Sequence, residues 1–182
     1  MKLRPLILTA LFAALTAAGA FLQIPVHPVP VTLQFLFTAM AGILLGRRYG
    51  ALSQLVYVAL GLMGLPVFTS GGGLGYVFQP SFGFLLGLIP CAWVIGFLSR
   101  KRDGTLWLAV SCCAGLAVLY LIGVPYMALI LNVYWEKGLG LKAILMAGMI
   151  PFLPGDALKI AVAAAVCPVL KDRLCSFDEF QR

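Results

Sequence analysis

The amino-acid sequence predicts an all-α membrane protein in which six transmembrane helices form one compact bundle, with both termini in the cytoplasm. Of the 182 residues, 62% are hydrophobic and only 10% are charged, whereas soluble globular domains carry about 25% charged residues. Such a chain cannot cover itself with groups compatible with water, so the lipid bilayer has to be its solvent. Six apolar runs of near-spanning length then give the number of helices.

The helices are predicted from the apolar runs between polar or Gly/Pro-rich breaks. They cover residues 5–24, 30–46, 50–65, 82–98, 105–133 and 154–170 of a single membrane domain, 1–182. A spanning helix needs ~17–25 residues, so several runs are short and require loops that fold back into the bundle. The first run follows "MKLR" and contains "AAGA", as a signal peptide would, but its spanning length and the membrane segments behind it favour a helix.

The distribution of lysine and arginine sets the orientation. With the N-terminus inside, ten of the thirteen lie at inner ends: Lys2, Arg4, Arg47, Arg48, Arg100, Lys101, Arg102, Lys171, Arg173 and Arg182. Lys137 and Lys142 lie at outer ends, and Lys159 lies within the membrane. Because cytoplasmic loops collect positive residues, we expect a multi-pass protein of the cell (plasma or inner) membrane with both termini cytoplasmic. The net charge of +7 then reflects topology and indicates no nucleic-acid partner.

The outer connections are long and rich in proline and glycine, whereas the inner ones are tight. The longest, residues 66–81 ("PVFTSGGGLGYVFQPS"), is predicted to be a lid loop over a ligand, because glycine lets backbone amides approach a bound molecule closely. Gly72 and Gly73 are the candidates for this approach. The loop lacks the lysine signature of a phosphate-binding loop, and no strand precedes it, so no nucleotide site is expected.

The stretch "PFLPGDALK" places two opposite charges, Asp156 and Lys159, at the start of an apolar helix. Three residues apart, they share one helix face, and each charge in a spanning segment costs about 2.5–3.5 kcal/mol on insertion scales. One explanation is a purely structural ion pair. The other is a ligand clamp, in which the carboxylate accepts hydrogen bonds and the ammonium donates them. A cyclic urea and a zwitterionic amino acid both suit such a clamp, and the pair alone does not choose between them.

Further polar and aromatic residues are predicted to reach the same outer layer of the membrane. Small-ligand sites are mostly apolar with a few placed polar groups. The polar candidates are Thr32 and Gln34, which open the second helix, Gln79 before Pro80, and Tyr126 late in the fifth helix; Phe68, Tyr76 and Phe84 are the candidate apolar walls.

The sequence predicts neither an enzyme nor a metal protein, and no resident cofactor. No Ser/His or Cys/His constellation is present, His27 is the single histidine, and Cys91, Cys112, Cys113, Cys167 and Cys175 are interpreted as small apolar packing residues. Without a nucleotide site, uphill transport of a solute would need energy from another protein.

Small residues form a stripe on the first helix at four-residue spacing. Ala10, Ala14 and Ala18 lie on one face and allow another helix to approach closely. We interpret this stripe as a docking surface for another membrane protein.

Two long blocks of the sequence resemble the BioY family, the biotin-binding S components of energy-coupling factor (ECF) transporters. They are "PVPVTLQFLFTAMAGILLGRRYGALSQLVYVALGLMGLPVF" and "PFLPGDALK", and the resemblance covers roughly residues 6–172. It implies a six-helix subunit that captures biotin from outside and works with a membrane T component and two cytosolic ATPases. ATP would be used only by these partner subunits.

The resemblance also implies roles for particular residues. The aspartate and lysine of the family's GDxxK motif, here Asp156 and Lys159, would bind biotin, whose ureido ring is a cyclic urea. The stripe of Ala10, Ala14 and Ala18 would contact the T component. The alternative is an S component or stand-alone facilitator for another small solute.

One stretch departs from the family pattern. Residues 79–84 read "QPSFGF", where family members usually read like "GPTGGY", so Phe82 replaces a glycine and the loop geometry is expected to differ. Gln79 can still bond to a ureido ring. For the ligand's carboxylate, the backbone amides of residues 71–73 are the candidate partners.

Overall fold

The computed structural model describes residues 3–25, 28–101 and 104–174, with side chains to residue 171. His27, Cys175, Lys2, Arg102 and Arg182 lie outside the described residues, and of Arg173 only the helical backbone is described. The described chain is helical apart from one short hairpin and its loops.

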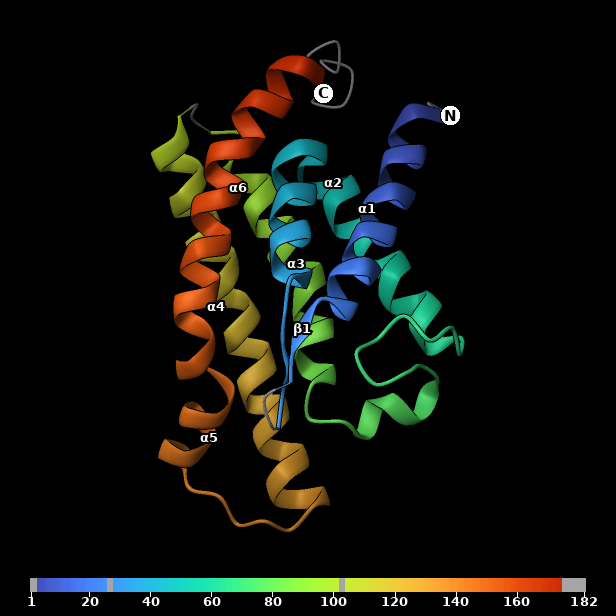
Figure 1. Cartoon of the computed structure of the whole chain (residues 1–182), viewed down its shortest axis with the longest axis vertical. Helices are drawn as coiled ribbons and strands as arrows, with labels where there is room; N and C mark the ends of the chain where they lie inside the picture. The colour runs from blue at the N-terminus through green and yellow to red at the C-terminus, as the bar shows by residue number, and fades with distance from the viewer. Residues whose placement is uncertain (1–2, 26–27, 102–103, 175–182) are drawn as a thin grey trace.

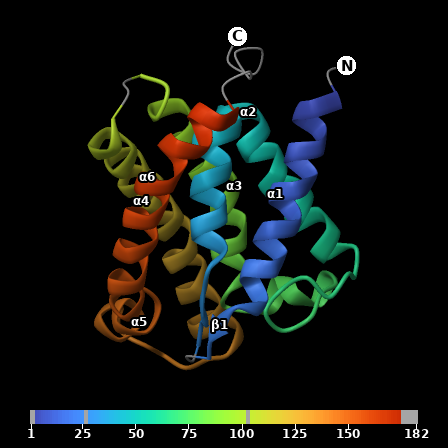
Figure 2. The same ribbon diagram turned by 45° about the horizontal axis from the view of Figure 1, so that its top comes forward.

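The elements follow in the order α1 (Leu3–Phe21), β1 (Gln23–Ile24), β2 (Val31–Thr32), α2 (Gln34–Leu62), the 3-10 helix η1 (Leu74–Phe78), α3 (Phe82–Leu98), α4 (Thr105–Leu129), the π-helical turn η2 (Ile130–Tyr134), α5 (Leu141–Gly148), the 3-10 turn η3 (Ile150–Phe152) and α6 (Leu153–Leu174). The helices form one bundle, in which the start of α1 and the end of α6 lie at the same end (Figures 1 and 2). The hairpin, η1 and α5 lie toward the other end.

The second helix differs from its prediction at its start. Val31 and Thr32 form strand β2, which pairs antiparallel with Gln23 and Ile24 of β1, and the helix begins at Gln34. Prolines at positions 25 and 30 push the residues before them, Ile24 and Val29, toward extended backbone. The extended conformation continues to Thr32 because β2 pairs with β1. Thr32 therefore lies on a strand and does not open the helix. The first helix also ends earlier than predicted, at Phe21.

The two helices predicted over 30–46 and 50–65 form one element, α2, that reverses at a single residue. Gly46 has φ 75° and ψ −179° inside α2, a backbone region open almost only to glycine. The two halves pack closely, because a Cβ built on Gly50 would lie 2.9 Å from the Cα of Gly42. Gly46 thus replaces the predicted loop by a one-residue corner.

Three helical stretches are long and apolar enough to cross a membrane: Leu3–Phe21, Thr105–Tyr134 and Leu153–Lys171. The apolar helix Phe82–Leu98 is shorter, and each half of α2 is shorter than a full span. The fold therefore combines full-length spans with short helices, and the hairpin and lid loop lie beside the short ones (Figure 1).

A buried polar cluster joins α1 to both halves of α2. The amide of Gln54, fully buried, donates to Thr16 Oγ1 (3.3 Å) and Ser53 Oγ (3.0 Å). Its Oε1 accepts from Thr38 Oγ1 at 3.0 Å. Polar side chains at membrane depth need protein partners, and here these bonds tie three helical segments together.

Replacement of Gly46 by alanine is expected to destabilise the protein by about 1–3 kcal/mol, because a Cβ makes this φ/ψ combination unfavourable. Gly75→Ala is the control, since a Cβ there meets nothing within 4 Å and its φ is ordinary. Thermal unfolding in detergent micelles measures both. Equal stability of the two variants would contradict the role assigned to the corner.

Candidate functional site

Asp156 and Lys159 form a buried ion pair in the first turns of α6. Lys159 Nζ lies 2.8 Å from Asp156 Oδ1, and the two residues are 5% and 7% exposed. Asp156 occupies the first helical turn, where the positive end of the helix dipole favours a carboxylate. Helix geometry thus places both charges on one face, against α2 and α4.

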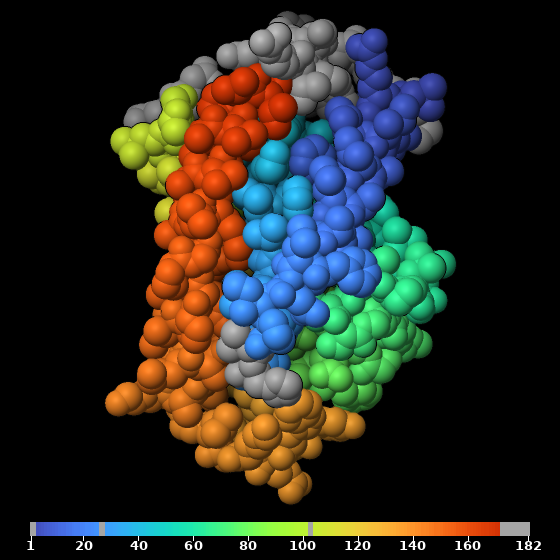
Figure 3. All heavy atoms as spheres, in the orientation of Figure 1, coloured from blue at the N-terminus to red at the C-terminus, as the bar shows by residue number. Residues whose placement is uncertain are grey.

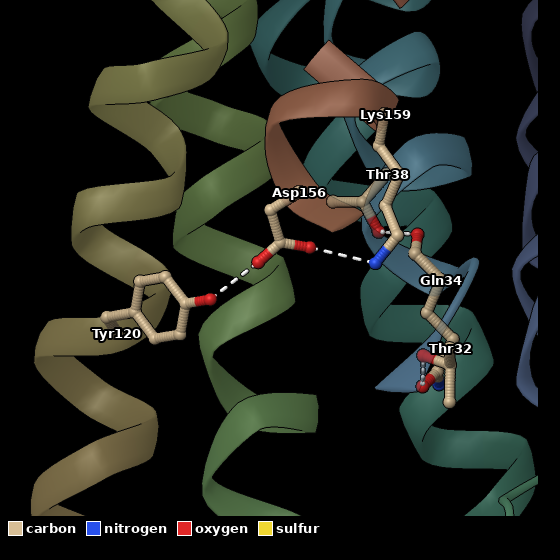
Figure 4. Close-up of polar contacts among 6 residues, drawn as sticks. All are labelled: Thr32, Gln34, Thr38, Tyr120, Asp156 and Lys159. Carbon is tan, nitrogen blue, oxygen red and sulfur yellow. Dashed lines mark hydrogen bonds and ion pairs between the residues drawn. The ribbon is translucent and has the colours of Figure 1, made fainter. Parts of the chain in front are cut away.

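Tyr120 of α4 is the second hydrogen-bond partner of the carboxylate. Its Oη donates to Asp156 Oδ2 at 2.5 Å, so each carboxylate oxygen accepts one hydrogen bond (Figure 4). Lys159 carries three N–H groups, and among the described residues only Asp156 is bonded to its Nζ. Two ammonium hydrogens therefore have no acceptor in the described part of the chain.

The pair lines a pocket inside the bundle, with an empty volume of about 570 Å³ including its open mouth. The walls are largely apolar, with polar side chains in three groups; the lining residues are Val29, Pro30, Thr32, Gln34, Phe35, Thr69, Tyr76, Ser81, Phe84, Leu85, Leu88, Leu119, Tyr120, Phe152, Asp156 and Lys159.

Gln34 anchors a second polar group in the wall of the pocket. Its Oε1 accepts from Thr32 Oγ1 at 2.8 Å, and its Nε2 donates to Tyr57 Oη at 2.7 Å. Tyr57 in turn donates to the carbonyl of Val67 in the lid loop at 3.1 Å. One Nε2 hydrogen of Gln34 remains available to a ligand, because a primary amide carries two.

Aromatic rings form the apolar wall next to the ion pair. Phe84 packs perpendicular to Tyr120, with ring centroids 6.3 Å apart, and stacks with Phe152 at 6.5 Å. The pocket therefore offers flat apolar surface beside its charged end.

The structure brings together six of the residues predicted to bind a ligand: Thr32, Gln34, Tyr76, Phe84, Asp156 and Lys159 all line this pocket. The other five, Phe68, Gly72, Gly73, Gln79 and Tyr126, are not among its lining residues. Gln79 is exposed, and its backbone N–H bonds to the carbonyl of Tyr76.

The remaining predicted residues hold the lid loop to the bundle. Phe68 is 1% exposed and packs between Tyr57 and Tyr76. Tyr126 Oη donates to the carbonyl of Val77 at 2.6 Å.

The glycine loop folds onto the end of α2. The N–H of Gly73 donates to the carbonyl of Gly61 at 2.7 Å, and that of Gly71 to Phe68 at 3.3 Å. A Cβ on Gly72 would lie 2.1 Å from the carbonyl oxygen of Leu65. The loop therefore uses its glycines for close approach to its own backbone, and two of its amides already have acceptors within the protein.

Sequence reasoning missed Tyr120 and Tyr57. The usable signal was a tyrosine inside an apolar run, since a buried phenol needs a hydrogen-bond partner. Only the packing of α4 against α6 identifies Asp156 as the partner of Tyr120.

Comparisons with known proteins agree on one family. The BioY family model matches residues 1–175. A relative from Lysinibacillus sphaericus, described as a probable biotin transporter BioY, is 42% identical over 163 residues, which are 88% of this chain and 83% of the relative. The biotin transporter BioY of Thermotoga maritima is 39% identical over 170 residues, 93% of this chain and 96% of that protein.

One solved structure is similar over nearly the whole fold. It is the S component for biotin from an ECF-type ABC transporter, with a TM-score of 0.82 and 27% sequence identity. The similarity covers 94% of this chain and 92% of that one.

Removal of one partner of the ion pair is expected to destabilise the protein more than removal of both charges. Lys159→Met leaves the buried Asp156 carboxylate with Tyr120 alone, and a broken buried pair costs about 3–5 kcal/mol. Asp156→Asn/Lys159→Met, which retains an acceptor for Tyr120, should recover most of this loss. Thermal unfolding of the ligand-free protein in detergent compares the two, and a double variant no more stable than the single would contradict the argument.

Proposed function

This chain belongs to the BioY family, and from that membership we propose that it is the biotin-binding S component of an ATP-driven ECF-type importer. The observation that carries the proposal is the buried Asp156–Lys159 pair in the wall of a pocket inside the bundle. The protein binds its solute without chemical conversion, so it is not an enzyme. ATP acts on it only through partner subunits.

The polar groups of the pocket match the ureido ring of biotin. This ring has two N–H donors and one carbonyl acceptor. Asp156 retains lone pairs for a ring N–H beyond its bonds to Lys159 and Tyr120, and Lys159 has ammonium hydrogens for the carbonyl. The spare Nε2 hydrogen of Gln34 is a second donor on the same wall, and Phe84 and Phe152 provide surface for the fused ring.

We place six passes in the membrane: α1, the two halves of α2, α3, α4 and α6. Both termini are cytoplasmic in this arrangement, and the lid loop faces outside. In support, the corner at Gly46 packs on the end of α3, where a Cβ on Gly96 would lie 2.4 Å from the nitrogen of Arg47. The basic residues of that corner thus lie at the same end of the bundle as the start of α1 and the end of α6 (Figures 1 and 2).

The exposed face of α1 is the proposed contact with the T component. Ala10, Ala14 and Ala18 are all exposed, and α1 lies uncovered along the front of the molecule (Figure 3). A smooth strip of alanines lets a partner helix approach closely. Two ATPases would act on the subunit through this T component.

Asp156→Ala and Lys159→Ala are each expected to weaken biotin binding by at least about tenfold, since a hydrogen bond to a charged group contributes roughly 1.5–3 kcal/mol. Titration of the purified protein with biotin measures this. Lys142→Ala, an exposed lysine of α5, is the control for loss of a positive charge. Unchanged affinity in both pocket variants would refute the proposed clamp.

A panel of vitamins separates biotin from other solutes. A selective ligand raises the unfolding temperature by mass action, and we expect biotin alone to do so at micromolar concentration. Stabilisation by another vitamin, with none by biotin, would favour an S component or facilitator for that solute.

Ala14→Leu is expected to prevent co-purification with the T component while leaving biotin affinity unchanged, because the added side chain separates the two helices. Ala117→Leu, at an exposed alanine of α4, is the matched control and should assemble normally. Normal assembly of the Ala14 variant would exclude the stripe as the docking surface.

A further inference from the structure

Three hydroxyl groups of the lid region meet in the wall of the pocket. Thr69 Oγ1 lies 2.8 Å from Tyr76 Oη, and Ser81 Oγ donates to the same Tyr76 oxygen at 3.1 Å. All three residues line the pocket. We refer to Thr69, Tyr76 and Ser81 as the hydroxyl cluster.

The hydroxyl cluster has one hydrogen more than its internal bonds use. Three hydroxyls carry three hydrogens, and the cluster contains two hydrogen bonds. If Tyr76 donates to Thr69, the spare hydrogen is on Thr69; if Thr69 donates to Tyr76, it is on Tyr76. In either arrangement one O–H remains to donate to a bound molecule.

The other donors of the pocket belong to the opposite wall. Tyr120 donates to Asp156, and Thr32 donates to Gln34. Among the lining side chains of the described chain, the donors left over are therefore those of Lys159 and Gln34, beside the ion pair, and that of the hydroxyl cluster.

The two polar regions lie on different sides of the bundle. Asp156 and Lys159 project from α6, which packs on α2 and α4, whereas Tyr76 lies in η1, which packs on α3. Figures 1 and 2 show α6 and the lid loop on opposite sides of the β1–β2 hairpin. Apolar side chains such as Leu85 and Leu88 line the pocket as well. Such a pocket suits a ligand with two polar ends joined by a hydrocarbon segment.

We propose that the hydroxyl cluster of Thr69, Tyr76 and Ser81 is the subsite for the carboxylate at the end of the biotin side chain. This inference rests on the proposed function. With the ureido ring at Asp156 and Lys159, the hydrocarbon chain lies along the apolar walls and the carboxylate accepts the spare O–H. A hydrogen bond to a carboxylate is stronger than one to a neutral acceptor, so the cluster selects ligands with an anionic end.

The test compares biotin with its primary amide, which keeps the ring, the chain and nearly the same size but carries no charge. The measured quantity is the ratio of the two dissociation constants. In the variant Thr69→Val/Tyr76→Phe/Ser81→Ala, which keeps the shapes of the side chains, we expect the preference for biotin over the amide to fall about 5–10-fold. All three hydroxyls are replaced because each single change lets a neighbouring hydroxyl reorient toward the ligand.

Tyr126→Phe is the matched control. It removes another tyrosine hydroxyl that holds the same lid loop, through the carbonyl of Val77, but Tyr126 does not line the pocket. A loosened lid should weaken both ligands by the same factor and leave the ratio unchanged. If this triple variant does not fold, Thr69→Ala/Tyr76→Phe/Ser81→Ala serves in its place, because it also removes all three hydroxyls and introduces no branched side chain.

The outcomes separate this subsite from the proposed function. An unchanged ratio in a folded hydroxyl-free variant overturns the subsite alone. The subsite is also overturned if the hydroxyl-free variant keeps the preference for biotin over the amide while Lys159→Met loses it. That result would place the carboxylate at the lysine. No binding of biotin by the wild-type protein overturns the proposed function and the subsite together.

Discussion

The organisation of this protein depends on the burial of one ion pair in a membrane helix. A lone charge at that depth is unfavourable, and the attraction between two opposite charges offsets this only when their remaining hydrogen-bonding capacity is also satisfied. Each carboxylate oxygen of Asp156 accepts one hydrogen bond within the protein, from Lys159 or Tyr120. Lys159 meets the condition only in part, since two of its hydrogens find no acceptor among the described residues. The pair is therefore a stable structural element that still has bonding capacity for a ligand, and the two explanations of its presence are compatible.

The same requirement explains how the lid loop is attached. Loop backbone near membrane depth has to find partners within the protein, and tyrosine hydroxyls provide them. Tyr57 holds the carbonyl of Val67, Tyr126 holds that of Val77, and Tyr76 joins two hydroxyls across the loop. Tyr57 is also bonded to Gln34 in the pocket wall. One phenol is therefore bonded both to the pocket wall and to the lid loop.

The short helices leave room for loops at one end of the bundle. The two halves of α2, on either side of Gly46, are each shorter than a full span, and the hairpin and lid loop lie at their ends away from Gly46 (Figure 1). The pocket lies where these segments replace full-length helix.

The sequence by itself determined the membrane class, the positions of the apolar helices and the charged pair, because composition, apolar run length and three-residue spacing on a helix are local properties. It also carried enough of the BioY pattern to identify the family. The tertiary structure decided which polar residues share a pocket with that pair. Tyr120 and Tyr126 lie six residues apart on α4, and only the packing of α6 against α4 brings Tyr120 to Asp156 and leaves Tyr126 to the lid. Side-chain partners on different helices depend on crossing geometry, and that geometry is set by contacts between segments far apart in the chain.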